Sequence, residues 1–178
     1  MVIANSIKAE HRPAFASAGE DVPYIEWHRR LLTAISDTQY RVISKRHPKD
    51  YFTNMTLFSD LADVELHTGA FTGQLDQADA FVFDFAASAF MEALCTDKPV
   101  VLVEFPHRKL SEIGRRDVSA VCTVVHAEYD EQNRIVADLE LVLHGLQQPV
   151  DKNAREKFGN DYLLAQSGDI GEFTSMLG

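Results

Sequence analysis

Residues 78–103 read Ala78-Asp-Ala-Phe-Val-Phe-Asp84-Phe-Ala-Ala-Ser88-Ala-Phe-Met-Glu92-Ala-Leu-Cys-Thr-Asp-Lys98-Pro-Val-Val-Leu-Val103, and this stretch decides the fold. The apolar run at 80–83 has no polar alternation, which is typical of a parallel strand covered on both faces. Ser88 is a candidate N-cap for a helix that carries Glu92 one turn further on. Pro99 then opens a second apolar run. The stretch therefore predicts one strand–helix–strand unit.

The sequence on either side of this unit alternates between expected strands and expected helices. We expect further strands at 2–5, 40–44, 63–66 and 120–125, and helices at 23–35, 52–59, 68–77 and 130–146. The last helix is expected because Ile135, Leu139, Val142 and Leu146 recur at helical spacing. This alternation predicts a doubly wound α/β fold, with a mostly parallel sheet of about six strands and helices on both faces.

The length of 178 residues is enough for one domain with a substantial core. We expect it to span residues 1–178, with a body at 1–150 and short helices at 151–178 that pack back through Phe158 and Tyr162. No apolar run approaches the roughly 20 residues of a membrane-spanning helix, and the N-terminus does not resemble a secretory signal. We therefore expect a cytoplasmic protein, with Cys95 and Cys122 as buried free thiols.

Charge and motif content argue against several classes of function. A formal net charge of −10 disfavours a broad nucleic-acid-binding surface, so we expect no nucleic-acid partner. The chain has neither Gly-x-Gly-x-x-Gly nor the P-loop pattern, and it lacks the Gly-x-Ser-x-Gly of nucleophile elbows. Neither His-Glu-x-x-His nor Cys-x-x-Cys occurs, so we expect no metal site.

Polar and basic side chains follow three of the expected strands. Lys45 and His47 follow the strand at 40–44, Ser88 follows the next apolar strand at the start of a helix, and His107 and Arg108 follow the run that ends at Val103. The carboxyl ends of parallel strands share one edge of a sheet, and ligands bind there beside helix N-termini. A phosphate needs N–H and hydroxyl donors together with local positive charge. The sequence therefore predicts an anion site at this edge.

Each of these residues also has a purely structural interpretation. Ser88 is a common type of helix cap, and Asp84 at a strand end is a common type of turn residue. Glu92 and His107 are typical of solvated surface positions. The cluster Lys45–Asp50 is equally typical of a solvated turn. The candidate site therefore depends on several weak signals that meet at one edge.

Two sets of motifs occur in an order that resembles the motif order of a known protein family. The first set directly follows an expected strand and reads Lys45-Arg-His47-Pro48. The second set comes later in the chain and reads Ala78-Asp79-x4-Asp84-x3-Ser88-x3-Glu92-Ala-Leu-x3-Lys98-Pro-Val. In order and spacing they resemble the C-terminal, donor-nucleotide-binding domain of GT-B type glycosyltransferases. The nearest relatives by this resemblance are the capsule polysaccharide synthesis proteins and the CDP-glycerol glycerophosphotransferases of teichoic acid synthesis. The resemblance covers residues 40–103, with weaker agreement at Phe158–Leu163.

The resemblance implies a donor-binding role in surface polysaccharide or teichoic-acid-like polymer synthesis. Lys45, His47 and Ser88 would contact the phosphate of a nucleotide-linked sugar or glycerol donor, and Glu92 would hold the ribose. His47 is then the candidate catalytic residue, because its charge and that of Lys45 would offset charge developing on the departing phosphate. Three more polar residues at the same edge are candidate members of the site: Asp84, His107 and Arg108.

The same resemblance implies a partner and a location. A GT-B enzyme needs a second Rossmann-like domain for its acceptor, and the acceptor would bring peripheral association with the inner face of the membrane. The nucleotide-activated donor would be a substrate, with no separate cofactor. Ala86 and Ala87 depart from the family pattern, because hydroxyl residues normally precede Ser88 there. The phosphate would therefore depend more on backbone N–H groups.

Two other functions remain open on the sequence. A non-catalytic interaction domain, which kept the fold and lost the activity, agrees with the two alanines and with the single Rossmann-like unit. A receiver-like signalling domain agrees with a strand that ends in Asp84. However, receivers carry acidic residues after their first strand, where Asn5-Ser6 stand here, and Lys98-Pro99 precedes a strand instead of following one. Nucleotide binding would distinguish the transferase interpretation from both.

Overall fold

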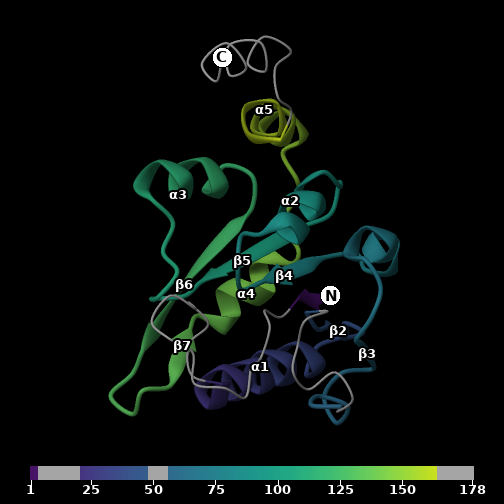
Figure 1. The fold of residues 1–178 in the computed structure, drawn as a ribbon, viewed down its shortest axis with the longest axis vertical. Helices are drawn as coiled ribbons and strands as arrows, with labels where there is room; N and C mark the ends of the chain where they lie inside the picture. Colours follow the sequence, from purple (N-terminus) through teal and green to yellow (C-terminus); the bar gives the residue numbers. More distant parts are fainter. Residues whose placement is uncertain (4–20, 48–55, 164–178) are drawn as a thin grey trace, which may run out of the picture.

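The computed structural model describes residues 1–3, 21–47 and 56–163 (Figure 1). Its strands are β1 (Val2–Ile3), β2 (Ile43–Lys45), β3 (Val64–Leu66), β4 (Phe81–Phe83), β5 (Val100–Glu104), β6 (Thr123–Tyr129) and β7 (Ile135–Ala137). Its helices are α1 (Asp21–Ser36), the 3-10 helix η1 (Phe71–Gln77), α2 (Ser88–Leu94), α3 (Glu112–Ser119), α4 (Leu139–Gly145) and α5 (Lys152–Tyr162). The helix expected at 52–59 lies half outside the described residues, and residues 57–61 form bends and turns.

The strands form one sheet in the order β3-β2-β1-β4-β5-β6-β7. Neighbours from β3 to β6 are parallel, and β7 runs antiparallel to β6. Val2 of β1 lies opposite Ser44 on one side and Val82 on the other. The chain therefore builds outward from β1 in one direction and then, from β4, in the other. This is the strand order of a doubly wound, Rossmann-like sheet, and the predicted fold class is confirmed.

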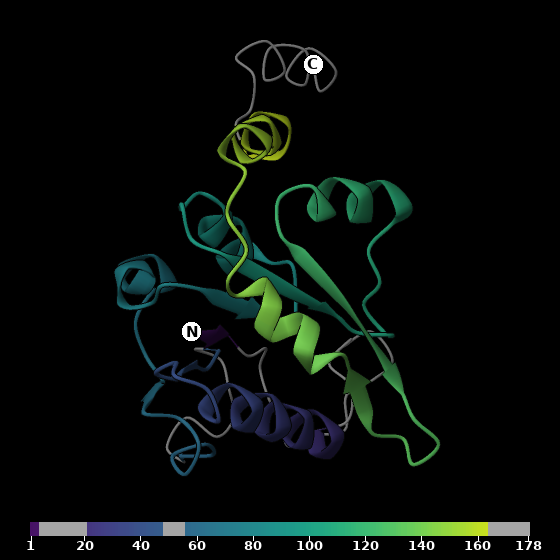
Figure 2. The same cartoon turned by 180° about the vertical axis from the view of Figure 1, so that it is seen from behind.

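Both faces of the sheet are covered, as the central strands β4 and β5 show. Val82 and Val101 belong to a core cluster that includes residues of α1 and α4. Phe83 and Leu102 belong to a second cluster, with residues of α2, α3 and α5. Figure 1 shows α2 on the near face of the sheet, and Figure 2 shows α4 on the opposite face. Successive strand residues point to opposite faces, so an unbroken apolar run suits this position.

The helix expected at 130–146 is wrong in its first half, and the sheet consequently gains a seventh strand. Asp130 Oδ1 accepts the N–H groups of Gln132 and Arg134 at 2.9 and 2.8 Å, and Asn133 has a φ of 60°. This tight turn reverses the chain between β6 and β7. Ile135 is therefore buried from a strand, while the later apolar residues are buried from α4. A strand followed by a helix satisfies the same apolar spacing as one long helix.

The C-terminal helix α5 packs back onto the body of the domain. Phe158 is 6% exposed within the second core cluster. The guanidinium of Arg155 is buried, and its Nε and Nη1 donate to the carbonyl oxygens of Val121 and Lys98 at 3.1 and 2.9 Å. Tyr162, the other expected anchor, is 48% exposed, but its ring centroid lies 4.6 Å from that of Phe158 and its hydroxyl donates to Asp117 of α3. Arg155 thus ties α5 to the loops at the amino ends of β5 and β6.

The two cysteines are free, but only one of them is shielded from solvent. Burial raises the pKa of the Cys122 thiol to about 12, against the opposing charge of Arg155. Cys95 is exposed at the C-cap position of α2. The expectation of two buried thiols is therefore wrong for Cys95.

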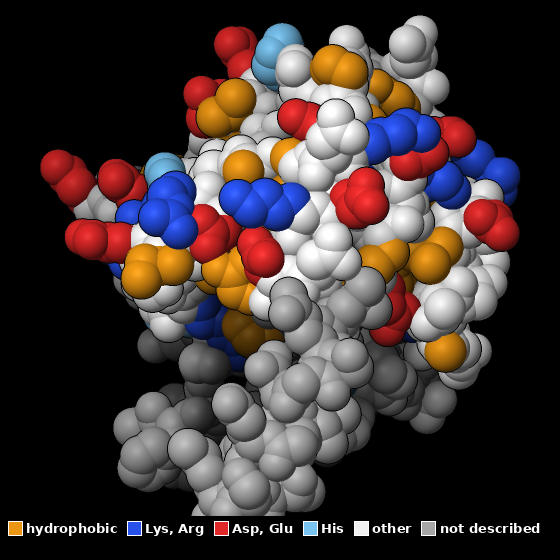
Figure 3. All heavy atoms as spheres, turned by 90° about the horizontal axis from the view of Figure 1, so that it is seen from above, with side chains coloured by type: hydrophobic (Ala, Val, Ile, Leu, Met, Phe, Trp, Pro, Cys, Tyr) orange, Lys and Arg blue, Asp and Glu red, His pale blue; other side chains and the backbone are white. Residues whose placement is uncertain are grey.

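The face of the molecule seen from above in Figure 3 carries basic and acidic side chains that are intermingled. Positive side chains are not gathered into a stripe on this face, in agreement with the formal net charge of −10.

We predict that Gly145→Ala destabilises the domain, because α4 crosses the sheet too closely for a side chain there. A Cβ at Gly145 would meet Val101 Cγ2 at 2.8 Å and Thr123 Cβ at 2.9 Å. Such overpacking costs about 1–3 kcal/mol of unfolding free energy, measurable by urea denaturation. Gly159→Ala on α5 is the matched control, because its Cβ would meet nothing within 4 Å, and it should be neutral or stabilising. Equal stability of the two variants would contradict the prediction.

Candidate functional site

A pocket of about 240 Å³ opens at the carboxyl ends of β1, β2 and β4. Ile3 of β1, the segment Lys45–His47 and the residues that follow Phe83 line it, and Gly69–Phe71 completes the wall. β1 and β4 are the neighbours at which the strand order reverses. Ligands of doubly wound sheets bind in the crevice at that point. The pocket therefore lies where the topology favours a ligand site.

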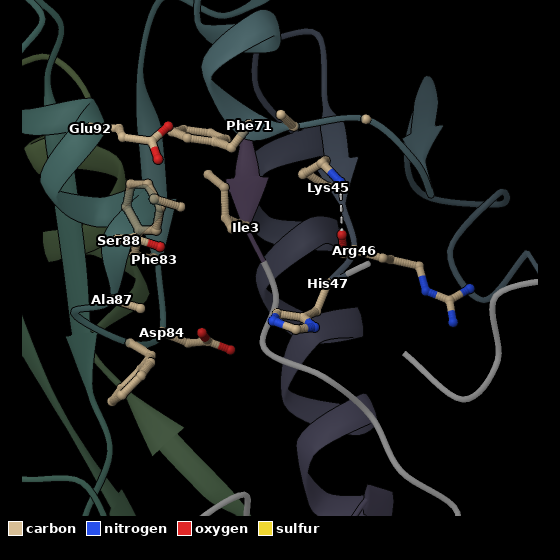
Figure 4. A pocket seen from close by; sticks show the side chains of 14 residues that line it. Ile3, Lys45, Arg46, His47, Phe71, Phe83, Asp84, Ala87, Ser88 and Glu92 are labelled. Carbon is tan, nitrogen blue, oxygen red and sulfur yellow. Dashed lines mark hydrogen bonds between the residues drawn. The ribbon is translucent and has the colours of Figure 1, made fainter. Parts of the chain in front are cut away.

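The pocket brings together five of the predicted residues, which come from segments far apart in the sequence: Lys45, His47, Asp84, Ser88 and Glu92. Figure 4 shows Lys45 and His47 on one wall and Ser88 and Glu92 on the opposite wall. The close pairing of β1 with both β2 and β4 fixes the spacing of these two walls. The pocket thus has a basic side and a side with a hydroxyl and a carboxylate.

His107 and Arg108, the other two predicted residues, are not among the residues that line this pocket. The Arg108 guanidinium carbon lies 4.1 Å from the ring centroid of Phe85, which does line it. His107 Nδ1 lies 3.0 Å from the hydroxyl of Tyr129. Burial lowers the pKa of His107, Arg108 lowers it further, and the negative charge of Asp84 raises it. Both residues therefore belong to the rim of the site.

Lys45 is a buried cation on the wall of the pocket, only 3% exposed. Its Nζ donates to the carbonyl oxygen of Arg46 at 3.0 Å, as Figure 4 shows. Burial lowers the pKa of this amine. An anion bound in the pocket would stabilise the charged, ammonium form of Lys45. Arg46 is also buried, but its guanidinium points away from the pocket in Figure 4, and its Nη1 lies 3.5 Å from His67 Nδ1.

Ser88 is the first residue of α2 and not its N-cap, which corrects the prediction. Ala87 occupies the cap position, with φ −109° and ψ −168° and no side-chain cap hydrogen bond. The Ser88 side chain is exposed on the pocket wall. Glu92 lies one turn further along the same helix face, and its Oε2 accepts from the hydroxyl of Thr72 at 2.6 Å. Thr72, on η1, therefore fixes the orientation of the Glu92 carboxylate.

Asp84 directly follows β4 and is held from the other side of the sheet by α1. Its Oδ2 accepts a hydrogen bond from the Tyr24 hydroxyl, and His28 Nε2 lies 3.2 Å from the same oxygen. Asp84, Tyr24 and His28 are 7%, 6% and 1% exposed. The Tyr24 ring also meets the His28 ring edge-on, with centroids 4.6 Å apart. The strand-end carboxylate is therefore a structured member of the pocket wall and not a solvated turn residue.

Tyr24 and His28, which hold Asp84 on the pocket wall, are supporting residues that the sequence interpretation missed. They lie four residues apart near the start of α1, the helix that follows β1. The spacing places both on one helix face, and a helix that follows a parallel strand begins at the carboxyl edge of the sheet. Two polar residues at this spacing on an otherwise apolar helix face are the sequence feature that could have revealed their role.

A second polar cluster, centred on Glu104 at the end of β5, holds the loop that carries His107 and Arg108. The carboxylate accepts from Arg115 at 3.1 and 3.2 Å, from the N–H of Leu110 at 2.6 Å and from His126 Nδ1 at 2.7 Å. Burial alone raises the pKa of Glu104, but these hydrogen bonds outweigh it, so the pKa lies below its ordinary value of 4.5. The cluster thus joins the loop after β5 to α3 and β6.

The described residues contain no group of three or more His, Cys, Asp or Glu side chains that could hold a metal ion. Within the same residues, none of the helices has the length and hydrophobicity needed to cross a bilayer.

Fold and site together define a Rossmann-like, doubly wound α/β domain whose pocket at the switch point carries polar side chains on a partly apolar lining. Comparison with protein-family models, with curated proteins and with solved structures found no match. The case for a function therefore depends on the geometry of the pocket.

We predict that Glu104→Gln lowers the free energy of unfolding by about 1.5–3 kcal/mol near neutral pH, because hydrogen bonds to a charged acceptor are lost. The depressed pKa of Glu104 means that its stabilisation is present above pH 4.5 and is lost as the pH falls through the lower folded pKa. The difference in unfolding free energy between wild type and variant, measured by urea denaturation, should therefore disappear in acid. Glu156→Gln, at an exposed position on α5, is the control. A gap that is the same at all pH values would contradict this assignment.

Proposed function

We propose that this domain binds the nucleotide of an activated donor, a nucleotide-sugar or CDP-glycerol, for a glycosyl- or glycerophosphotransferase of surface polymer synthesis. One observation carries the proposal: the pocket at the switch point assembles Lys45, His47, Ser88 and Glu92 on facing walls. These side chains supply cations, a hydroxyl donor and a carboxylate acceptor. A phosphate needs the first two, and a ribose diol suits the third.

In this proposal the two walls divide the donor between them. The phosphates lie against Lys45 and His47, where a low-exposure environment strengthens charge interactions. Ser88 donates its hydroxyl to a phosphate oxygen from the opposite wall. Glu92, already oriented by Thr72, accepts from the ribose hydroxyls. The base then lies beyond Glu92, near the backbone of Gly69–Phe71 on the pocket wall.

The chemistry that follows is electrostatic stabilisation of a leaving group. As the bond between the transferred group and the phosphate breaks, negative charge grows on the phosphate oxygen. His47 and Lys45 offset that charge in place, without a change in their position. In the proposed enzyme, the acceptor and its catalytic base come from a second Rossmann-like domain. Membrane association would be peripheral and would follow from the acceptor.

We predict that a nucleoside diphosphate stabilises the purified chain and binds it in calorimetry. The test is a thermal-shift and calorimetry panel of CMP, CDP, UMP, UDP and GDP. A preference for one base would support a donor-binding site and identify its nucleotide. A flat response at millimolar ligand would count against the proposal and favour an interaction domain that kept only the fold.

Variants at the two walls sharpen the same test. His47→Ala should weaken binding by about 1.5–3 kcal/mol, because a charge-assisted hydrogen bond is lost, and Ser88→Ala by about 0.5–1.5 kcal/mol. Both should keep the wild-type melting temperature without ligand. Matched controls are His144→Ala on α4 and Ser119→Ala on α3, which are exposed and do not line the pocket. Unchanged affinity in both wall variants would remove His47 and Ser88 from the site.

A further inference from the structure

A buried carboxylate is an unexpected feature in a pocket that is proposed to bind an anion. Asp84 lines the pocket, is 7% exposed, and carries two polar contacts from α1 on a single oxygen. A carboxylate in this position repels a phosphate unless it acts through another group. The packing of Tyr24 and His28 around it shows that its placement is built into the fold.

Figure 4 shows where the Asp84 side chain is directed. Its carboxylate and the imidazole of His47 point toward one another across the mouth of the pocket. His47 is half-buried, and it stands on the basic wall at the end of β2. The charge of Asp84 also acts on His107: burial and Arg108 lower the pKa of that imidazole, and Asp84 opposes them. Asp84 thus faces His47 across the pocket and acts electrostatically on His107 beside it.

We propose that Asp84 is a positioning residue for His47, which it holds protonated and directed at bound phosphate, and that Tyr24 and His28 keep Asp84 in place. A nearby negative charge favours the protonated form of an imidazole. An acidic side chain that orients a histidine toward its target is the arrangement of catalytic triads. The inference rests on the proposed function, since it specifies how the same pocket recognises a phosphate or diphosphate group.

The proposal explains why a pocket for an anion contains the carboxylate of Asp84. An imidazolium donates from both ring nitrogens, so it can serve a carboxylate on one side and a phosphate oxygen on the other. Other charged and titratable groups approach Asp84 and His47 from several described elements. Tyr24 and His28 of α1 contact Asp84, while Lys45 of β2 and Glu92 of α2 line the same pocket. The loop after β5 adds His107 and Arg108 beside the pocket, and the Arg46 guanidinium is directed away from it.

The test compares wild type with Asp84→Asn, which keeps the size of the side chain and removes its charge. The ring protons of His47 are followed by NMR during a pH titration, and pyrophosphate affinity is measured by calorimetry at about pH 8 and about pH 5.5, on either side of the usual histidine pKa. We expect the His47 midpoint to fall in the variant. We expect pyrophosphate binding about tenfold weaker at the higher pH and within about twofold at the lower one, where His47 is protonated without help.

A structural role for Asp84 would give a different result. Loss of packing would weaken pyrophosphate binding equally at both pH values and would leave the His47 midpoint where it is in wild type. Either result would overturn the proposal. Asp97→Asn is the matched control: Asp97 is exposed, pairs with Lys152 and lies between α2 and β5 at the opposite edge of the sheet, so this variant should leave the His47 titration unchanged.

Tyr24→Phe provides an independent variant if Asp84→Asn does not fold. It removes one hydrogen bond to Asp84 and keeps the ring that packs on His28 and Phe105. The His47 midpoint should move in the same direction by a smaller amount, and an unmoved midpoint would count against the proposal. If pyrophosphate fails to bind wild type at all, the proposed function falls, while the His47 titration still decides the role of Asp84.

Discussion

The enclosure of β4 on both faces is the constraint on which the rest of the structure depends. Phe81, Val82 and Phe83 are each at most 2% exposed, and β4 pairs with β1 on one edge and β5 on the other. Burying each such side chain contributes roughly 1.5–3 kcal/mol, and this requires helices on both faces of the sheet. At its carboxyl end the enclosed strand borders the candidate pocket, and there the chain places Asp84.

The pocket depends on helices from both faces of the sheet. Ser88 and Glu92 come from α2, which covers one face of the sheet, while Asp84 is fixed by Tyr24 and His28 of α1, which covers the other. A shift of either helix would therefore change the pocket. The buried side chains of Asp84, Tyr24 and His28 are paired with one another, as the low-dielectric interior demands. That pairing makes Asp84 part of the buried interior instead of a surface residue.

Much of the fold could be predicted from the sequence, because its signals are local. An unbroken apolar run, a helix start and Pro99 define the central unit without reference to the rest of the chain. The prediction failed at residues 130–137, where the helical spacing of Ile135 with later residues is shared by a strand followed by a helix. The side chain of Asp130 decides between them, since its hydrogen bonds to the backbone close the turn. Ser88 was misassigned as a cap because a hydroxyl near a helix start does not reveal which residue has the extended backbone.

The sequence by itself determined that strands and helices alternate, that several polar residues follow strand ends, and that those ends meet at one edge of a parallel sheet. Only the tertiary structure decided which of these ends are neighbours. The strand order places β1 between β2 and β4, so His47, Asp84 and Ser88 share one pocket, while His107 remains at the rim beyond β4. The physical reason is that apolar periodicity records which face of an element is buried, whereas strand order depends on contacts between residues distant along the chain. Tyr24 and His28 illustrate this, because their partner Asp84 is 60 and 56 residues away.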